Sequence, residues 1–261
     1  MSLQIYIIDA FSDQLFGGNP AAVVPLNEWP TTEIMQKIAQ ENNQTETAFY
    51  LPLANGLFQI RFFTPIVEVN LSGHATLAAA HVIFRIKKHV NSKLIFQTAA
   101  TELIVNNLGE NLQLVLPLDY FLETKAPDKL LKAIGTKPNE IYIGREYYLC
   151  VFDYEEKIKR IAPDFNLLSE LKSAGIIVTA KGNDVDFVCR YFSPAYGTNE
   201  DPATGSIQSM LMNYWSKKLH KKELSSKQLS ARGGNFVATI NEDGVYLTGN
   251  AITYLIGEIN L

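Results

Sequence analysis

Glu46, His74 and Asp201 are the residues whose types and positions could support proton transfer. Glu46 lies in the segment NQTETAFYL, directly before a strand-like apolar run, and burial of a carboxylate raises its pKa towards the range of a general acid or base. His74 stands in the first turn of an apolar predicted helix, and Asp201 precedes Pro202 in NEDPATGS. A surface glutamate at a strand edge and an aspartate that closes a turn are the structural alternatives.

Two predicted helix starts could bind an anion. Residues 72–74 (Ser-Gly-His) and 204–206 (Thr-Gly-Ser) would present free backbone N–H groups and hydroxyls at the positive end of a helix. Each start would contribute about 0.3 to 1 kcal/mol to binding a carboxylate. If the two starts face one cleft, a small carboxylate-bearing molecule is the expected substrate, whereas ordinary helix capping is the alternative.

Other chemistries lack their sequence signatures. The histidines, at positions 74, 81, 89 and 220, have no zinc-like spacing with cysteine or carboxylate, so no metal site is expected. Segment TGS followed by Ile207 does not form a G-x-S-x-G nucleophile elbow. The glycines of FGGNP and RGGNF lack the spacing of a dinucleotide or phosphate-binding loop and would instead permit tight turns or close approach to a ligand. Cys150 and Cys189 lie in apolar strand-like runs and are predicted to be packing residues.

Composition excludes several classes of partner. The formal net charge is −4 and basic residues occur at most in pairs, so nucleic acid is not an expected partner. No apolar run reaches the roughly 18 to 20 residues of a membrane span, so no membrane segment is predicted. The N-terminal residues lack the features of a signal peptide, and a cytoplasmic location is therefore expected.

The elements that would position these residues fall into two similar halves. Strand-like runs fill each half, and each contains a helix of small or apolar residues, one from about Gly73 and one from about Gly205 to Lys218. Each helix follows a near-identical segment, RFFTP at residues 61–65 and RYFSP at residues 190–194. The pattern predicts halves at residues 1–118 and 119–261, with the final strand able to pair back with the first half. The alternative to two similar halves is that a common strand-loop-helix element occurs twice by chance.

The sequence resembles the phenazine biosynthesis PhzF-like proteins, which have the diaminopimelate epimerase-like fold. The segments that carry the resemblance are DAFSDQLFGGNPAAVV, NQTETAF, IRFFTPIVEVNLSGHATLAAAHVIF, RYFSPAYGTNEDPATGS and LSARGGNF, in the family's order over nearly the whole chain. The resemblance implies an α+β protein with two pseudo-symmetric halves, each a curved, mainly antiparallel, barrel-like sheet around a central helix. It also implies a cofactor-independent isomerase, a homodimer, and an active site in the cleft between the halves.

The resemblance also assigns roles to individual positions. It implies that Glu46 is the catalytic acid or base, supported by His74 and Asp201. It further implies that the substrate is bound by residues at the two helix starts and in the GGNP segment, namely Asn19, Ser72, Gly73, Gly205 and Ser206. Gln208 and Ser209 stand where relatives often have His and Cys, and Ser72 stands where relatives often have Cys.

Three functions remain open from the sequence. The first is an isomerase that moves a proton between carbons of a small carboxylate, with Glu46 acting on one face of the substrate. The second is an amino-acid racemase or epimerase that uses carboxylate and imidazole in place of thiols. The third is a non-catalytic protein that retains the fold and binds a small molecule.

Overall fold

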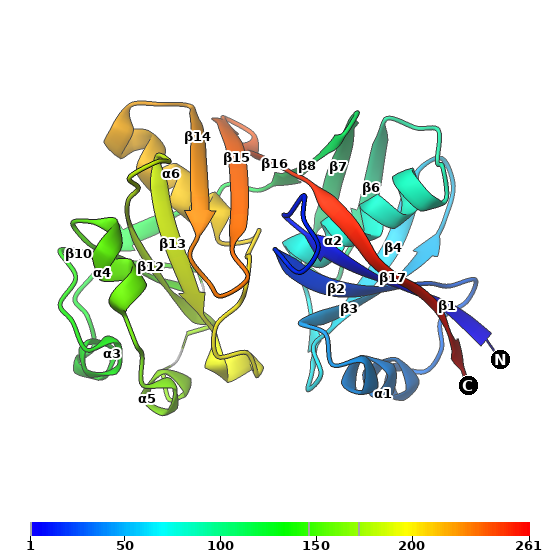
Figure 1. The fold of residues 1–261 in the computed structure, drawn as a ribbon, viewed down its shortest axis with the longest axis horizontal. Coiled ribbons are helices and arrows are strands. Elements are labelled where there is room, and N and C mark those ends of the chain that lie inside the picture. Colours follow the sequence, from blue (N-terminus) through cyan, green and yellow to red (C-terminus); the bar gives the residue numbers. More distant parts are fainter. Residues whose placement is uncertain (1, 146, 172) are drawn as a thin grey trace. The chain divides into compact units, whose positions relative to one another are not determined.

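The computed structural model describes residues 2–145, 147–171 and 173–261. The chain forms two compact units (Figure 1). The first comprises residues 1–116 and 246–261, and the second comprises residues 117–245. Strand β16 (Gly244–Gly249) carries the chain from the second unit back into the first.

The first unit is a continuous curved sheet. Its neighbouring strands follow the order β17, β1, β2, β3, β4, β6, β7, β8 and β16, with the two-residue β5 beside β4. Most neighbours are antiparallel, but the β2 and β3 pair and the β4 and β6 pair are parallel. The bounds are β1 Ser2–Ala10, β2 Asn19–Pro25, β3 Glu46–Pro52, β4 Leu57–Phe63, β5 Glu68–Val69, β6 Lys93–Gln97, β7 Glu102–Leu108, β8 Asn111–Leu116 and β17 Ala251–Asn260.

Two helices cover the opposite faces of this sheet. Helix α1 (Thr32–Asn42) packs its Met35, Ile38 and Ala39 onto residues of β1 to β4. Helix α2 (Gly73–His81) packs against β1, β2, β3, β7, β8 and β17, and it continues into a π-helical turn, η1 (Val82–Ile86). Figure 1 shows α2 within the curve of the sheet. The alanines of α2 are fully buried, because small side chains allow a helix to lie this close to the strands.

The second unit repeats this arrangement. Its strands follow the order β9, β10, β11, β12, β13, β14 and β15. The β11 and β12 pair and the β13 and β14 pair are parallel, and the other pairs that the described residues form in this order are antiparallel. The bounds are β9 Phe121–Glu123, β10 Glu140–Gly144, β11 Tyr147–Val151, β12 Gly175–Lys181, β13 Phe187–Phe192, β14 Glu223–Gln228 and β15 Gly234–Asn241.

Helices also cover both faces of the second sheet. On one face, α3 (Asp128–Ile134), α4 (Glu155–Arg160) and α5 (Phe165–Ser169) pack onto β12 and β13. On the other, α6 (Gln208–Leu219) packs against β14 and β15, and its Trp215 stacks on Phe187 and donates a hydrogen bond to Thr179 at 3.0 Å. A short 3-10 turn, η2 (Pro194–Tyr196), follows β13. Because both faces are covered, β12 is buried along nearly its whole length.

The same order of parallel and antiparallel pairs occurs in both units, and this confirms the predicted α+β fold of two similar halves. Strands β1 to β4, β6 and β7 of the first unit correspond to β10 to β15 of the second. The central helix follows the fourth strand of each set, α2 after β4 and α6 after β13.

An arginine clamp explains the two near-identical segments. Arg61 donates two hydrogen bonds to Glu68, at 2.7 and 2.8 Å, and its guanidinium lies 5.3 Å from the ring centre of Phe63. Arg190 makes the same two contacts with Glu200, at 2.7 and 2.9 Å, and lies 4.9 Å from the ring centre of Phe192. In each unit the clamp ties the end of a strand to the loop that leads into the central helix.

Some predicted elements differ from those observed. The helix expected from Gly205 begins at Gln208, because residues 205–207 form a tighter turn in which the Gly205 carbonyl accepts from the Gln208 amide at 3.1 Å. The strand-like sequence at residues 141–152 forms two antiparallel strands, β10 and β11. Within the described residues, no helix has both the length and the apolar character needed to span a membrane.

Candidate active site

Glu46 and Asn19 begin two neighbouring parallel strands. Glu46 is the first residue of β3 and pairs with Ala21 of β2, whose first residue is Asn19. Since the strands are parallel, their first residues lie at the same end of the sheet. Asn19 is fully buried and Glu46 is partly buried.

The alternation of side chains assigns both residues to the face covered by α2. Phe49 and Leu51 of β3, and Ala22 and Val24 of β2, pack in the cluster with α1. Successive side chains of a strand point to opposite faces, so residues three positions apart lie on opposite faces. Glu46 is three residues before Phe49, and Asn19 is three residues before Ala22. Both Glu46 and Asn19 therefore point away from α1. Helix α2 packs against both strands and carries His74. The first unit therefore brings Glu46, Asn19 and the helix of His74 to one face.

Ser72 caps α2 and holds His74. The Ser72 hydroxyl accepts a hydrogen bond from the Ala75 amide at 3.3 Å and lies 3.4 Å from Nδ1 of His74. Because the hydroxyl accepts from Ala75, its own proton is available to Nδ1, and this arrangement favours the tautomer with hydrogen on Nε2. Gly73, the first residue of the helix, is buried between them.

His74 is an uncharged imidazole at neutral pH. Its side chain is 4% exposed, and burial lowers its pKa to about 3. Among the described residues, its buried Nε2 has no hydrogen-bond partner. A buried polar atom of this kind is costly unless something else satisfies it, and functional sites are one place where such atoms occur.

Asp201 belongs to a second polar cluster, in the second unit. It is 6% exposed, its amide donates to the Tyr191 carbonyl at 3.1 Å, and its Oδ2 accepts a hydrogen bond from the Thr204 hydroxyl. Gln228, at the end of β14, donates to the Asp201 carbonyl at 2.6 Å and accepts from the Thr204 amide at 2.8 Å. These contacts fix the loop that precedes α6.

The remaining predicted residues of the second unit lie in and beside the turn before α6. Gly205 is buried and Ser206 is partly buried, and both precede the helix rather than form its first turn. Gln208 is fully buried and accepts from the Ser226 hydroxyl at 3.2 Å. The Ser209 hydroxyl accepts from the Asp119 amide at 2.8 Å and donates to the Pro117 carbonyl. The two departures from the family pattern thus act in the packing of α6 within its unit.

Neither cysteine has the character of a reactive thiol. Cys150 and Cys189 are fully buried and free, and burial raises the pKa of each thiol to about 12. The prediction that they are packing residues is confirmed. Among the described residues, no group of three or more His, Cys, Asp or Glu side chains is placed to hold a metal ion.

Sequence reasoning did not identify Gln228 as part of the Asp201 cluster. One signal was available, since β14 reads ELSSKQ with Leu224, Ser226 and Gln228 at its buried alternate positions. A polar residue at an inward position of a strand requires a buried partner.

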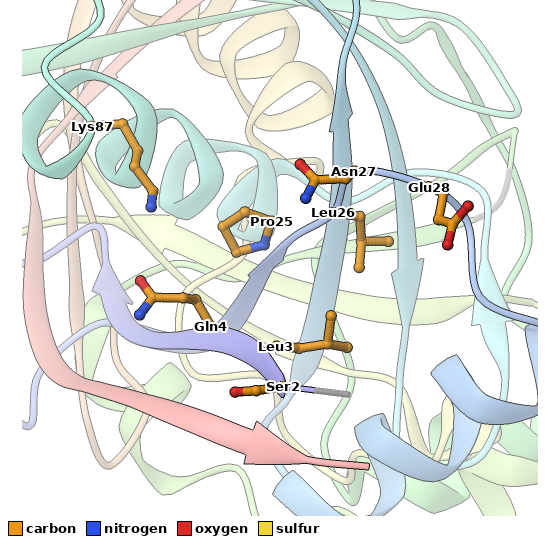
Figure 2. Close-up of a pocket in the computed structure, with 8 residues that line it drawn as sticks. All are labelled: Ser2, Leu3, Gln4, Pro25, Leu26, Asn27, Glu28 and Lys87. Carbon is orange, nitrogen blue, oxygen red and sulfur yellow. The ribbon is translucent and has the colours of Figure 1, made fainter.

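In the first unit, a pocket of about 500 Å³ contains none of the predicted residues (Figure 2). Its lining residues are Ser2, Leu3, Gln4, Pro25, Leu26, Asn27, Glu28 and Lys87.

Comparisons with known proteins agree with the resemblance. The sequence model of the PhzC-PhzF family, described as phenazine biosynthesis-like protein, matches residues 8–257. A protein of Pseudomonas aeruginosa named as an uncharacterized isomerase is 41% identical over 261 residues, which cover 100% of both chains.

Solved structures agree with the fold as well. The crystal structure of a PhzF-family phenazine biosynthesis protein from Enterococcus faecalis is 40% identical and has a TM-score of 0.94 over 100% of both chains. A hydroxyproline epimerase from Agrobacterium vitis, at 11% identity, has a TM-score of 0.64 over 99% of this chain and 92% of that one, which shows a shared fold alone. The predicted epimerase-like fold is confirmed, and the chain belongs to the phenazine biosynthesis-like PhzC-PhzF family.

Proposed function

We propose that the protein is a cofactor-independent isomerase that moves a proton between carbons of a small carboxylate-bearing substrate. The observation that carries the proposal is the face shared by Glu46, Asn19 and the helix of the uncharged His74. The family adds support, because relatives at 41% and 40% identity are named as uncharacterized isomerases.

Glu46 is the proposed acid and base. Its carboxylate removes a proton from one substrate carbon, and the electron pair left behind shifts through an adjacent double bond. The same carboxyl group then returns the proton to the far carbon of that system, so no atom or electron is gained or lost. A single carboxylate can act on one face of the substrate only, and positioned catalysis of this kind contributes about 10²- to 10⁴-fold in rate.

His74 is proposed to orient the substrate rather than to carry charge. With its pKa lowered to about 3 by burial, the imidazole is uncharged at neutral pH. Ser72 favours the tautomer whose Nε2 carries hydrogen, so this nitrogen would donate a hydrogen bond to a polar substrate atom. Asn19, Gly73, Gly205 and Ser206 are the proposed substrate-binding residues, and Asp201 is the second supporting group.

The decisive experiment follows deuterium from solvent. Small unsaturated and cyclic carboxylates are incubated with the protein in deuterated water, and mass spectrometry measures incorporation at carbon. Glu46→Gln keeps the shape of the side chain but removes the base, so incorporation should fall by about 10²-fold or more while substrate binding remains measurable. Glu41→Gln, on the exposed end of α1, is the matched control and should keep the wild-type rate. Equal rates in wild type and Glu46→Gln would contradict the proposal.

An amino-acid racemase or epimerase that works without thiols is the second candidate. The fold is shared with a hydroxyproline epimerase, and the two buried cysteines, each with its pKa raised to about 12, are poor bases. Chiral analysis of the product separates the candidates, because a racemase inverts a centre without moving a double bond. A protein that binds carboxylates but gives no incorporation with any of them would instead be the non-catalytic binder.

The proposal includes two properties of the whole protein. The reaction uses only side chains for proton removal and return, so dialysis against a chelator should leave the rate unchanged. The protein is also proposed to be a homodimer, as the family resemblance implies, and sedimentation equilibrium would give twice the 29.2 kDa mass of the chain.

A further inference from the structure

Gln228 uses its whole side-chain amide to hold the loop of Asp201. It is fully buried at the end of β14, and its Oε1 accepts from the Thr204 amide at 2.8 Å. Its Nε2 donates to the Asp201 carbonyl at 2.6 Å and to the Thr204 hydroxyl at 3.1 Å. A single buried side chain therefore makes three hydrogen bonds to a segment 24 to 27 residues away in sequence.

The chemistry of the two backbone partners fixes the orientation of this amide. The Thr204 N–H can only donate and the Asp201 carbonyl can only accept. If the oxygen and nitrogen of the Gln228 amide were exchanged, its NH₂ group would face the Thr204 N–H, a donor, and its oxygen would face the Asp201 carbonyl, an acceptor. Nε2 is therefore the atom that faces the Thr204 hydroxyl, and it can only donate there.

The direction of the next hydrogen bond follows. The Thr204 hydroxyl accepts from Gln228 and has a single proton of its own, which it gives to Oδ2 of Asp201. A proton on Oδ2 would compete with the hydroxyl proton for the same position. Hydrogen bonds donated to a carboxylate favour its charged form and lower its pKa.

We infer that Gln228 is a positioning residue that keeps Asp201 ionised by fixing the direction of the Thr204 hydroxyl. The role of Gln228 in catalysis rests on the proposed function, in which Asp201 supports proton transfer. The effect of Gln228 on the Asp201 carboxyl group does not depend on that function. As a carboxylate, Asp201 accepts hydrogen bonds and does not donate them.

The chain supplies a matched control in a second buried glutamine. Gln208 is also fully buried, and it contacts the same loop through the Thr204 carbonyl at 3.5 Å and accepts from Ser226 at 3.2 Å. Neither contact changes the direction of the Thr204 hydroxyl. Gln208→Met should therefore perturb packing as Gln228→Met does, without the same effect on the Asp201 carboxyl group.

The test measures the pKa of Asp201 directly. Protein labelled with ¹³C at the aspartate carboxyl group is titrated by NMR, and the Asp201 signal is identified by its absence from Asp201→Asn. Thr204→Val removes the hydroxyl at nearly constant shape, and Gln228→Met removes the group that directs it. Each should raise the pKa of Asp201 by about one unit, whereas Thr204→Ser and Gln208→Met should leave it within a few tenths.

Two results would overturn the inference. One is an Asp201 pKa that does not change in Thr204→Val, a variant that keeps both Gln228 contacts to backbone and is expected to fold. The other is an equal rise in Gln208→Met and Gln228→Met, since this would make the effect one of packing alone.

A rate measurement separates this inference from the proposed function. If both hold, the acid limb of the pH profile of kcat/KM for deuterium incorporation moves upward with the pKa of Asp201 in Gln228→Met. If Glu46→Gln keeps full activity while the NMR shift occurs as expected, the proposed function fails and the role of Gln228 in holding the carboxylate stands. An NMR shift with an unchanged pH profile would overturn the positioning role in catalysis.

Discussion

The two units share a scaffold but enter their central helices differently. Each unit has the same order of strand pairs and the same arginine clamp before its helix. In the first unit, Ser72 caps α2 and the helix begins at once. In the second, α6 begins at Gln208 after a turn, and its preceding residue, Ile207, provides no side-chain cap.

This difference shows how a repeated fold can present two kinds of polar group. The capped entry of the first unit holds an uncharged imidazole, His74, within the first turn of α2. The longer entry of the second unit is held by Gln228 and presents a carboxylate, Asp201. The shared strands and clamp supply rigidity, and the local hydrogen bonds at each helix entry decide the chemistry.

The largest expected difference between the units is in their response to acid. His74 and His81 of the first unit have pKa values lowered to about 3 and about 4, both chiefly by burial, with the charge of Arg85 a further cause for His81. The second unit contains only His220, which is exposed. Below pH 6.5 the unfolded chain binds protons that the folded first unit does not, so the free energy of unfolding falls as pH falls.

Lowering the pH from 7 to 5 should therefore cost about 2 kcal/mol for each of these two histidines, the buried His74 and the partly buried His81, or about 4 kcal/mol in total. Amide hydrogen exchange followed by mass spectrometry can assign the loss of protection to one unit. Protection should fall first in the first unit, and His81→Gln should remove about half of the pH dependence. Equal losses of protection in both units would show that other groups control acid unfolding.

The clamps provide the second comparison, since they differ in burial. The Arg190 and Glu200 side chains are 12% and 22% exposed, against 29% and 34% for Arg61 and Glu68. Arg190 also donates to the Ile158 and Ile161 carbonyls, at 3.1 and 2.7 Å. Arg190→Met leaves the two carbonyls and the partly buried Glu200 carboxylate without their hydrogen-bond donor. The substitution should therefore lower the free energy of unfolding by about 3 kcal/mol.

Arg61→Met is the matched variant and should cost only about 1 kcal/mol, because its ion pair is better solvated. Urea denaturation measures both values, provided that the dependence of the unfolding free energy on urea is unchanged. A cost for Arg61→Met equal to that of Arg190→Met would mean that the clamp itself, and not its burial, sets the contribution.

Local patterns in the sequence predicted much of the fold. Thr31 precedes helix α1, where a threonine favours capping, and its hydroxyl accepts from the Ile34 amide at 3.3 Å. Helix α3 (Asp128–Ile134) is followed directly by Gly135, a local signal for the end of a helix. These features depend on residues within one or two turns of each other, which a single sequence reveals. Helix α4 was not predicted, because five of its six residues are charged and only Ile158 is buried.

Long-range contacts limited what could be predicted of the site. The segment after Gly205 has small and apolar residues that suit a helix, yet the turn there is set partly by Gln228, which lies far along the chain. The shared face of Glu46 and Asn19 depends on the parallel register of β2 and β3. Residue types indicated which side chains could do chemistry, and pairing between distant strands determined which of them lie together.

The smallest expected effect is at the helix cap. Ser72→Ala removes the acceptor for the Ala75 amide and the hydroxyl beside Nδ1 of His74, whereas α6 has no equivalent side-chain bond to lose. The free energy of unfolding should fall by about 1 kcal/mol. Ser72→Thr keeps the hydroxyl and should retain most of that stability. The ¹⁵N chemical shifts of His74 should also show less hydrogen on Nε2 in Ser72→Ala, and unchanged shifts would mean that the tautomer is set by another contact of the ring.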